Sequence, residues 1–428
     1  MMRQIRANQS MLANAGSLVG TTAVTSGLGF IYWWLAARFY TPDAVGMASA
    51  AISAMTLLGN IGMSGLGTLL MGELPRRRGH VRPVIITSLA AAGALAAGAG
   101  TLFAVATPVL GHEFAVLAQN PATVTLFALG VALTGMTLVI DQAMIGLARG
   151  EIQLGRNALF AVAKLVALLA AGLWVAPRNA LVIYITWVLG LVVSLAALAT
   201  FAQRRGSVFR TCRPQWGLLR QLGRPALQHY GLNLALLAPS LALPVIVTAL
   251  LSASLNASFY AAWMVASFAY VGPTALSTVL YATASSNPSM LAEKMRVTLG
   301  LSAIIGILAC SVLLVAAGII LGFFGPSYAR QATGSLRILG LAVFPWIVKV
   351  HYVAIRRVQE RIATATGLMV AGMVLELALA TAGALWNGVP GLSLGWLVAL
   401  SGEALLIAPT VYRATKRSPT PQQQEPMP

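Results

Sequence analysis

The sequence predicts an all-α, polytopic integral membrane protein with about twelve transmembrane helices in two six-helix lobes. Three observations lead to this fold class: the apolar composition, the regular spacing of long apolar segments, and the basic residues gathered in alternate gaps. Of the 428 residues, 58% are hydrophobic and only 9% are charged, which lies outside the range of soluble domains. About 20 apolar residues cross the core of a bilayer, and roughly a dozen segments reach that length.

The predicted helices fall into an N-terminal lobe at residues 1–202 and a C-terminal lobe at residues 225–414. A basic cytoplasmic linker at 203–224 separates the lobes, and residues 415–428 form a polar tail, rich in Pro and Gln, that we expect to be disordered and cytoplasmic. The first apolar stretch is too long for a signal-peptide core, so we interpret it as a retained helix. Helices are predicted at 12–36, 44–71, 83–107, 122–148, 158–176, 180–202, 226–251, 257–282, 297–321, 334–355, 365–386 and 391–412.

The basic residues predict the orientation, because Lys and Arg accumulate in short cytoplasmic loops. With both termini cytoplasmic, 22 of the 28 basic residues fall on the cytoplasmic side, and Lys164 and Lys349 remain within the membrane. The net charge of +18 therefore reflects topology and contact with anionic lipids at the cytoplasmic face, and no nucleic-acid partner is expected. We expect a multi-pass protein of the cell inner (cytoplasmic) membrane. The basic residues at outer helix ends are Arg38, Arg178, Arg330 and Arg337.

A layout of six helices, a cytoplasmic linker and six helices is typical of transporters built from two repeats, with the substrate handled between the halves. Short similar stretches open the second helix of each lobe, Thr41-Pro-Asp-Ala-Val-Gly46 and Ser254-Leu-Asn-Ala-Ser-Phe-Tyr260. Small residues predict close helix packing, with flexing during transport as the alternative, at Gly59, Gly62, Gly65 and Gly67. Interior prolines predict kinks at Pro239, Pro244, Pro273, Pro345 and Pro409.

Five charged side chains fall inside predicted spans, where an isolated charge costs at least about 2.5–3.5 kcal/mol. Asp141 and Lys164 lie at similar predicted depths on neighbouring helices, which favours a salt bridge; a lining for an anionic headgroup and a proton relay are the alternatives. Lys349 would give the second half its own cation facing a central cavity. Glu376 and Glu403 would be its partners or coupling-ion sites.

The run Leu35-Ala-Ala-Arg-Phe-Tyr-Thr-Pro-Asp-Ala-Val-Gly46, followed by Gly59-Asn-Ile-Gly62, resembles the first two helices of a known family. These are the bacterial polysaccharide flippases of the multidrug/oligosaccharidyl-lipid/polysaccharide (MOP) exporter superfamily, related to MATE transporters and lipid II flippases. Asp141 through Arg149, with Arg156-Asn157 and Lys164, resembles the helix 4–5 region of that family. The opening of its second half resembles Leu243-Pro-Val-Ile-Val and Ala257-Ser-Phe-Tyr-Ala-Ala-Trp263.

The resemblance implies a MOP/MATE-like fold whose lobes alternate between inward- and outward-facing states. Its implied substrate is a polyprenyl-pyrophosphate-linked oligosaccharide turned from the inner to the outer leaflet, with a polysaccharide polymerase or glycosyltransferase as partner. Cations suit such a cavity, because pyrophosphate must lose water there. Related flippases place arginines in the first helices, whereas this chain has none between Arg6 and Arg38. Headgroup binding would therefore use Arg38, Lys164, Arg224 or Lys349.

Two other function classes compete with a flippase. A cation-coupled multidrug exporter of the same superfamily is favoured by Asp141, Glu376 and Glu403, although the first helix has no acid of the kind such antiporters use. A membrane glycosyltransferase needs a catalytic outer loop, but the longest one, 108–121, holds only Glu113 as an acid, so no enzyme is expected. Two cysteines far apart in the layout predict no disulfide, and we expect neither a metal nor a cofactor.

Overall fold

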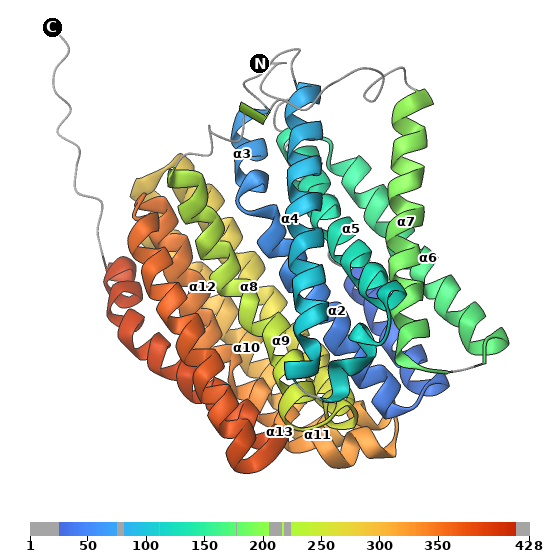
Figure 1. Cartoon of the computed structure of the whole chain (residues 1–428). Helices are drawn as coiled ribbons and strands as arrows, with labels where there is room; N and C mark the ends of the chain where they lie inside the picture. The colour runs from blue at the N-terminus through green and yellow to red at the C-terminus, as the bar shows by residue number, and fades with distance from the viewer. Residues whose placement is uncertain are drawn as a thin grey trace, which may run out of the picture. The chain divides into compact units, whose positions relative to one another are not determined.

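The computed structural model describes residues 25–74, 81–110, 112–176, 178–204, 216–217 and 224–416. All regular structure in these ranges is helical, as the all-α prediction requires (Figure 1). By their contacts the residues form two compact units, Met1–Tyr260 and Ala261–Pro428. The linker and tail expected at 203–224 and 415–428 lie almost entirely outside the described residues, so the division of the lobes at that linker stays a prediction.

The first unit contains the helix at 25–39 and the helices up to the start of α9. Within it α4 packs along α5, α6 packs along α7, and α2 contacts α4, α5, α7 and α8 (Figure 1). A short 3₁₀ helix, His112–Ala118, joins α4 to α5. The bounds are α2 Pro42–Met63, α3 Leu66–Glu73, α4 Val81–Leu110, α5 Pro121–Gly146, α6 Gly150–Trp174, α7 Ala180–Arg204 and α8 Arg224–Leu250.

The second unit begins within α9, which runs from Ala253 to Ser286. In this unit α10 packs along α11, and both α11 and α12 pack against α13. A 3₁₀ turn, Pro288–Met290, precedes α10. The remaining bounds are α10 Leu291–Gly322, α11 Pro326–Leu341, α12 Val343–Val358 and α13 Ile362–Lys416.

Nine helices in the described part of the chain are long and apolar enough to cross a membrane, and the bent pair α11 and α12 makes a tenth. The 55-residue helix α13 would be about 80 Å long if straight, far more than a bilayer core of about 30 Å. Its helical geometry fails at Asn387 and Gly388, where Gly388 has a φ of +58° that suits glycine. This break lies between the helices predicted at 365–386 and 391–412, so α13 is two arms of a hairpin.

Two other predicted spans are also interrupted. The helix expected at 44–71 is divided into α2 and α3 by Ser64 and Gly65, which both have positive φ values. The span expected at 334–355 begins earlier, at Pro326, and bends by 42° between α11 and α12. Pro345 is the third residue of α12 and has no amide hydrogen to continue the ladder from α11, so its predicted kink is confirmed.

The two short stretches that open predicted helices lie against each other in the first unit. Thr41 caps α2 through a 3.3 Å bond from the Ala44 amide, and Gly46 then meets the backbone of Ala253 at the start of α9. Asn256 donates from Nδ2 to the Gly46 carbonyl at 2.8 Å. A side chain at position 46 would overlap the Ala253 carbonyl, so this crossing requires glycine.

Candidate functional sites

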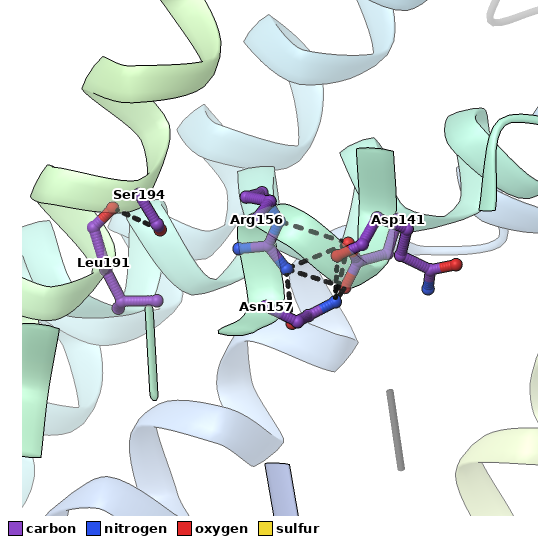
Figure 2. Close-up of polar contacts among 6 residues, drawn as sticks. Asp141, Arg156, Asn157, Leu191 and Ser194 are labelled. Atoms are coloured by element: carbon purple, nitrogen blue, oxygen red, sulfur yellow. Dashed lines mark hydrogen bonds and ion pairs between the residues drawn. The ribbon is translucent and has the colours of Figure 1, made fainter. Parts of the chain in front are cut away.

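Asp141 near the end of α5 forms a partly buried ion pair with Arg156 on α6 (Figure 2). The Nη2 group of Arg156 lies 2.9 Å from both carboxylate oxygens of Asp141, and its Nε lies 3.3 Å from Oδ1. The same Nη2 donates to Oδ1 of Asn157 at 2.7 Å. These bonds fasten the ends of α5 and α6 together at the turn between them.

The salt bridge expected between Asp141 and Lys164 is therefore wrong. The sequence prediction started the fifth helix at residue 158, whereas α6 begins eight residues earlier, at Gly150. Arg156 consequently lies inside the helix at the depth of Asp141. Lys164 is two turns further along α6, about 12 Å away, and is beyond the reach of that carboxylate.

Arg156 also keeps one nitrogen without a partner. Its Nη1 group is buried and makes no hydrogen bond to the described residues, and in Figure 2 it points away from Asp141. Residues four apart lie on one face of a helix, so Arg156, Phe160 and Lys164 form a stripe along α6. Arg156 is 5% exposed and Lys164 is 4% exposed, so both cations of this stripe are buried.

Lys164 lies inside a cage of aromatic rings, which we call the Lys164 cage. Its Nζ is 3.4 Å from the centroid of the Trp187 ring, 4.7 Å from that of Phe160 and 5.0 Å from that of Tyr32. Gly190 on α7 gives room for this side chain, because a β-carbon there would lie 2.9 Å from Cβ of Lys164. Within the described residues, no carboxylate and no hydrogen-bond acceptor reaches the ammonium group.

The rings of the cage are held in place by one another and by hydrogen bonds. Tyr32 donates to the Ile183 carbonyl at 3.0 Å, and its hydroxyl lies 2.8 Å from Oγ1 of Thr186. Trp33 continues the cluster, with ring contacts to Trp187 at 6.0 Å and to Tyr260 at 4.9 Å. Trp187 and Phe160 are half-buried, whereas Tyr32 is fully buried.

The second unit contains a separate group of buried charges, which we call the Lys349 cluster. Nζ of Lys349 on α12 bonds to the carboxyl group of Glu376 and lies 2.9 Å from Oε2 of Glu403. Glu376 belongs to the first arm of α13 and Glu403 to the second. The prediction that these two glutamates are the partners of Lys349 is confirmed, and one lysine connects three helical segments.

Trp396 and Gly372 complete the surroundings of the two glutamates. The Nε1 group of Trp396 donates to Oε2 of Glu376 at 2.7 Å, and the indole packs edge-on against Trp263 at 4.8 Å. Gly372 lies against the carboxyl group of Glu403. Lys349 and Glu376 are each 1% exposed and Glu403 is 2% exposed, so the cluster is closed to solvent.

The other two predicted binding residues do not join these groups. Arg38, at the end of the helix at 25–39, is exposed, and its guanidinium lies 5.7 Å from the ring of Trp34. Arg224 is the first residue of α8, and its side chain lies outside the described part of the structure. Neither finding tests a role in binding, so both residues remain predictions.

Sequence reasoning missed the aromatic residues that surround the buried charges, namely Tyr32, Phe160, Trp187 and Trp396. A signal for one of them was present: Phe160 lies four residues before Lys164 and four after Arg156, on the same face of a helix. Tyr32 and Trp187 are on other helices, and their approach to Lys164 depends on how those helices pack. Nothing in the sequence around Trp396 distinguishes it from an ordinary core residue.

Comparison with solved structures identifies the fold. A multidrug resistance MATE family transporter of the MOP superfamily, in its inward-facing conformation, matches 93% of this chain and 96% of its own, with a TM-score of 0.65 and 15% identity. The outward-facing conformation of such a transporter gives 0.62, with 14% identity over 94% of this chain and 96% of its own. No protein-family model and no curated protein matches the sequence.

A third neighbour has a distinct description. It is a MOP superfamily transporter from Pyrococcus furiosus, reported with a binding pocket of reverse polarity that suggests a different function. It matches 94% of this chain and 96% of its own, with a TM-score of 0.61 and 12% identity. Together these likenesses show that the chain has a MATE-like transporter fold, as the expected fold class stated.

Proposed function

We propose that the protein is a membrane transporter that flips a polyprenyl-pyrophosphate-linked oligosaccharide from the inner to the outer leaflet by alternating access. The MATE-like fold supports the transporter part of this proposal, because its neighbours are transporters described in inward- and outward-facing conformations. No covalent step is required for such a movement, so the protein acts as a carrier and not as an enzyme.

The Lys164 cage is the observation that carries the choice of substrate. Contact with an aromatic ring offsets about 0.5–2 kcal/mol of the cost of a buried cation, whereas desolvation of an ion costs several kcal/mol. Three rings without a counter-ion therefore leave Lys164 under-compensated. An anionic group of the substrate would supply the missing charge, and a pyrophosphate is such a group.

The same site suits the sugar part of the cargo. Tyr32 and Trp187 lie next to the cation, and Trp33 and Tyr260 continue the row of adjoining flat rings, each with a polar atom at one edge. Such rings combine a large apolar face with a hydrogen-bonding group, which matches the apolar faces and hydroxyl edges of sugar rings. We therefore assign the Lys164 cage to the junction between the anion and the first sugars.

A multidrug exporter is the second candidate, and it is favoured by the MATE neighbours and by the acids of the Lys349 cluster. Cationic drugs need an available acid, but both glutamates of that cluster are bonded to Lys349, and Asp141 is bonded to Arg156. The Pyrococcus furiosus neighbour, with its reported pocket of reverse polarity, is a precedent for another substrate class on this fold.

The flippase proposal includes a location and partners. We place the protein in the inner membrane, with its basic segments against anionic lipids and both termini in the cytoplasm. A glycosyltransferase would supply the lipid-linked oligosaccharide, and a polysaccharide polymerase would remove it on the outer side. Removal of the product in this way would drive net movement.

The test is a deletion strain that lacks any second flippase, with its polyprenyl-linked saccharides measured by mass spectrometry and assigned to a leaflet with a membrane-impermeant label. We expect the deletion to accumulate lipid-linked oligosaccharide in the inner leaflet, and the wild-type gene to clear it. Lys164→Met should fail to clear it and Lys164→Arg should clear part of it. Lys294→Met changes a half-exposed lysine, whose pairing with Glu293 lies outside the cage, and serves as the matched control.

Two outcomes separate the parts of the proposal. An unchanged lipid profile in the deletion strain would contradict the flippase and leave the small-molecule exporter, which drug-susceptibility measurements on the same strain would then examine. Accumulation in the deletion strain that Lys164→Met clears as well as wild type would keep the flippase and remove the Lys164 cage from substrate binding.

A further inference from the structure

The Lys349 cluster has more acid than base. Lys349, Glu376 and Glu403 are each no more than 2% exposed, in a chain whose helices are suited to a lipid environment. If both carboxyl groups are ionised, a net negative charge is left in a dry, low-dielectric interior. Such a charge is costly there, and two neighbouring carboxyl groups avoid it by retaining a proton.

The hydrogen bonds distinguish the two glutamates. Both oxygens of Glu376 accept from a donor, Oε1 from Lys349 and Oε2 from Trp396. Glu403 accepts from Lys349 at Oε2, but its Oε1 is buried and has no donor among the described residues. An ionised carboxylate can only accept, so this atom is the one at which a proton removes an unsatisfied charge.

The two carboxyl groups also bond to the same Lys349 ammonium group, which brings them close to each other. Two carboxylates repel, whereas a carboxylic acid donates to a neighbouring carboxylate. A contact of this kind between Glu376 and Glu403 is therefore favourable only when one of them is protonated. Charge balance, the orphan oxygen and this contact all require the same missing hydrogen.

We propose that the Lys349 cluster binds one exchangeable proton, held on Oε1 of Glu403 while Glu376 stays ionised. The protonated cluster is neutral overall: one ammonium, one carboxylate and one carboxylic acid. In this state it connects α12 to both arms of α13. Loss of the proton leaves a negative charge that water or a separation of the arms must relieve.

A proton suits this site better than a metal cation. Lys349 already places an ammonium group against both carboxyl groups, and a second full cation at the same place would be repelled. The described residues contain no set of three His, Cys, Asp or Glu side chains placed to hold a metal ion. A proton converts a charged group into a neutral one and adds no competing charge.

The other titratable groups of the surrounding described helices make no bond to these glutamates. Tyr270 on α9 donates to the Leu339 carbonyl at 2.5 Å, and Arg337 on α11 donates to the Leu314 carbonyl at 3.0 Å. On α12, Nδ1 of His351 lies 2.8 Å from the Ile347 carbonyl, and on α10 Cys310 is a free, buried thiol. Lys349 is thus the one cation paired with these glutamates in the described chain.

The experiment is infrared spectroscopy on the purified full chain in proteoliposomes, in D₂O at neutral and at high pH. The carbonyl stretch of a protonated carboxylic acid lies apart from the bands of ionised carboxylates. We expect wild type to show one such acid at neutral pH and to lose its band at high pH. This measurement needs no cargo, so its failure and the failure of the proposed flippase are distinguishable.

The variants test the charge balance directly. Glu403→Gln and Glu376→Gln each leave one glutamate paired with Lys349, so both should lose the band while keeping the size and shape of the side chain. Lys349→Met removes the cation, so two protonated acids and a band of twice the area are expected. Glu293→Gln changes an exposed acid and should leave the band unchanged.

Three results would overturn the proposal. The first is a wild-type spectrum without a protonated acid at neutral pH. The second is a band that survives in Glu403→Gln and Glu376→Gln, since the proton would then be elsewhere. The third is a band that sodium chloride removes at neutral pH and choline chloride does not, since the site would then exchange its proton for sodium. Helical circular dichroism on each variant verifies that the chain is folded.

Discussion

Gly372 leaves the space that the carboxyl group of Glu403 occupies, although the two residues belong to different arms of α13. A β-carbon built on Gly372 would lie 2.6 Å from both Cδ and Oε1 of Glu403, well inside van der Waals contact. The fit of the two arms and the position of a buried charge therefore depend on the same missing methyl group.

Gly372→Ala should lower stability, because the methyl group must displace a buried, hydrogen-bonded carboxyl group. We expect a cost of about 1–3 kcal/mol, the usual range for overpacking. Gly367→Ala is the matched control: it is on the same arm, nothing lies within 4 Å of its β-carbon, and helix propensity should make it neutral or slightly stabilising. Thermal unfolding in detergent measures both, and equal midpoints would contradict the packing described for Glu403.

The ion pair of Asp141 and Arg156 predicts a non-additive double-mutant cycle. Arg156→Met alone leaves a partly buried carboxylate without its cation and should cost about 3–5 kcal/mol. Asp141→Asn alone should cost a similar amount, since the guanidinium loses its acceptor. The double variant should be less destabilised than the sum of the two, by a coupling energy of 0.5 kcal/mol or more, roughly. Additive losses in thermal unfolding would show that the pair contributes nothing.

Gly46→Ala should be among the most damaging single substitutions in the first unit. The new β-carbon would overlap the Ala253 carbonyl, which is backbone and cannot rotate away. It would also displace the bond from Asn256 to the Gly46 carbonyl. Gly27→Ala, with nothing within 4 Å of its β-carbon, is the control, and the yield of folded protein on size-exclusion chromatography is the readout. A Gly46→Ala yield equal to that of Gly27→Ala would refute the close crossing.

Trp396→Phe removes the donor to Oε2 of Glu376 but keeps an aromatic ring against Trp263. A buried acceptor left without its donor costs about 1–3 kcal/mol, so the unfolding midpoint should fall. Trp386→Phe is the comparison, because Trp386 is exposed and should tolerate the change. If both variants unfold at the wild-type midpoint, the indole bond does not stabilise the cluster.

The positions of the spans followed well from hydropathy, because the length of an apolar run is set by the bilayer and not by tertiary packing. Even the break at Asn387 and Gly388 was placed correctly between two predicted helices. The start of α6 was not, because Glu151, Gln153 and Arg156 looked like loop residues, whereas packing and the bond to Asp141 keep them helical. Because of that one boundary, the partner predicted for Asp141 was Lys164, which lies two helical turns beyond Arg156.

Of the two candidate sites, the sequence predicted the contacts of one and not those of the other. The partners of Lys349 could be predicted, since only two further acids fall inside the last spans and a buried lysine needs acids. The surroundings of Lys164 could not, because aromatic residues are common in apolar helices and only rotation about each helix axis decides which ring faces a cation. Gly190 and Gly372 make space for Lys164 and Glu403. Their roles likewise could not be predicted, because they depend on which side chain the facing helix places there.

Because Trp187 lies close to Lys164, the intrinsic tryptophan fluorescence of the protein also reports on this site. A charge 3.4 Å from the centre of an indole ring perturbs the excited state of that ring. Any ligand that neutralises the ammonium group or displaces the ring will change the wavelength and the quantum yield of tryptophan emission. Occupancy of the site can thus be followed in unlabelled protein, with Trp187→Phe, which keeps the other eight tryptophans, as the reference for their emission.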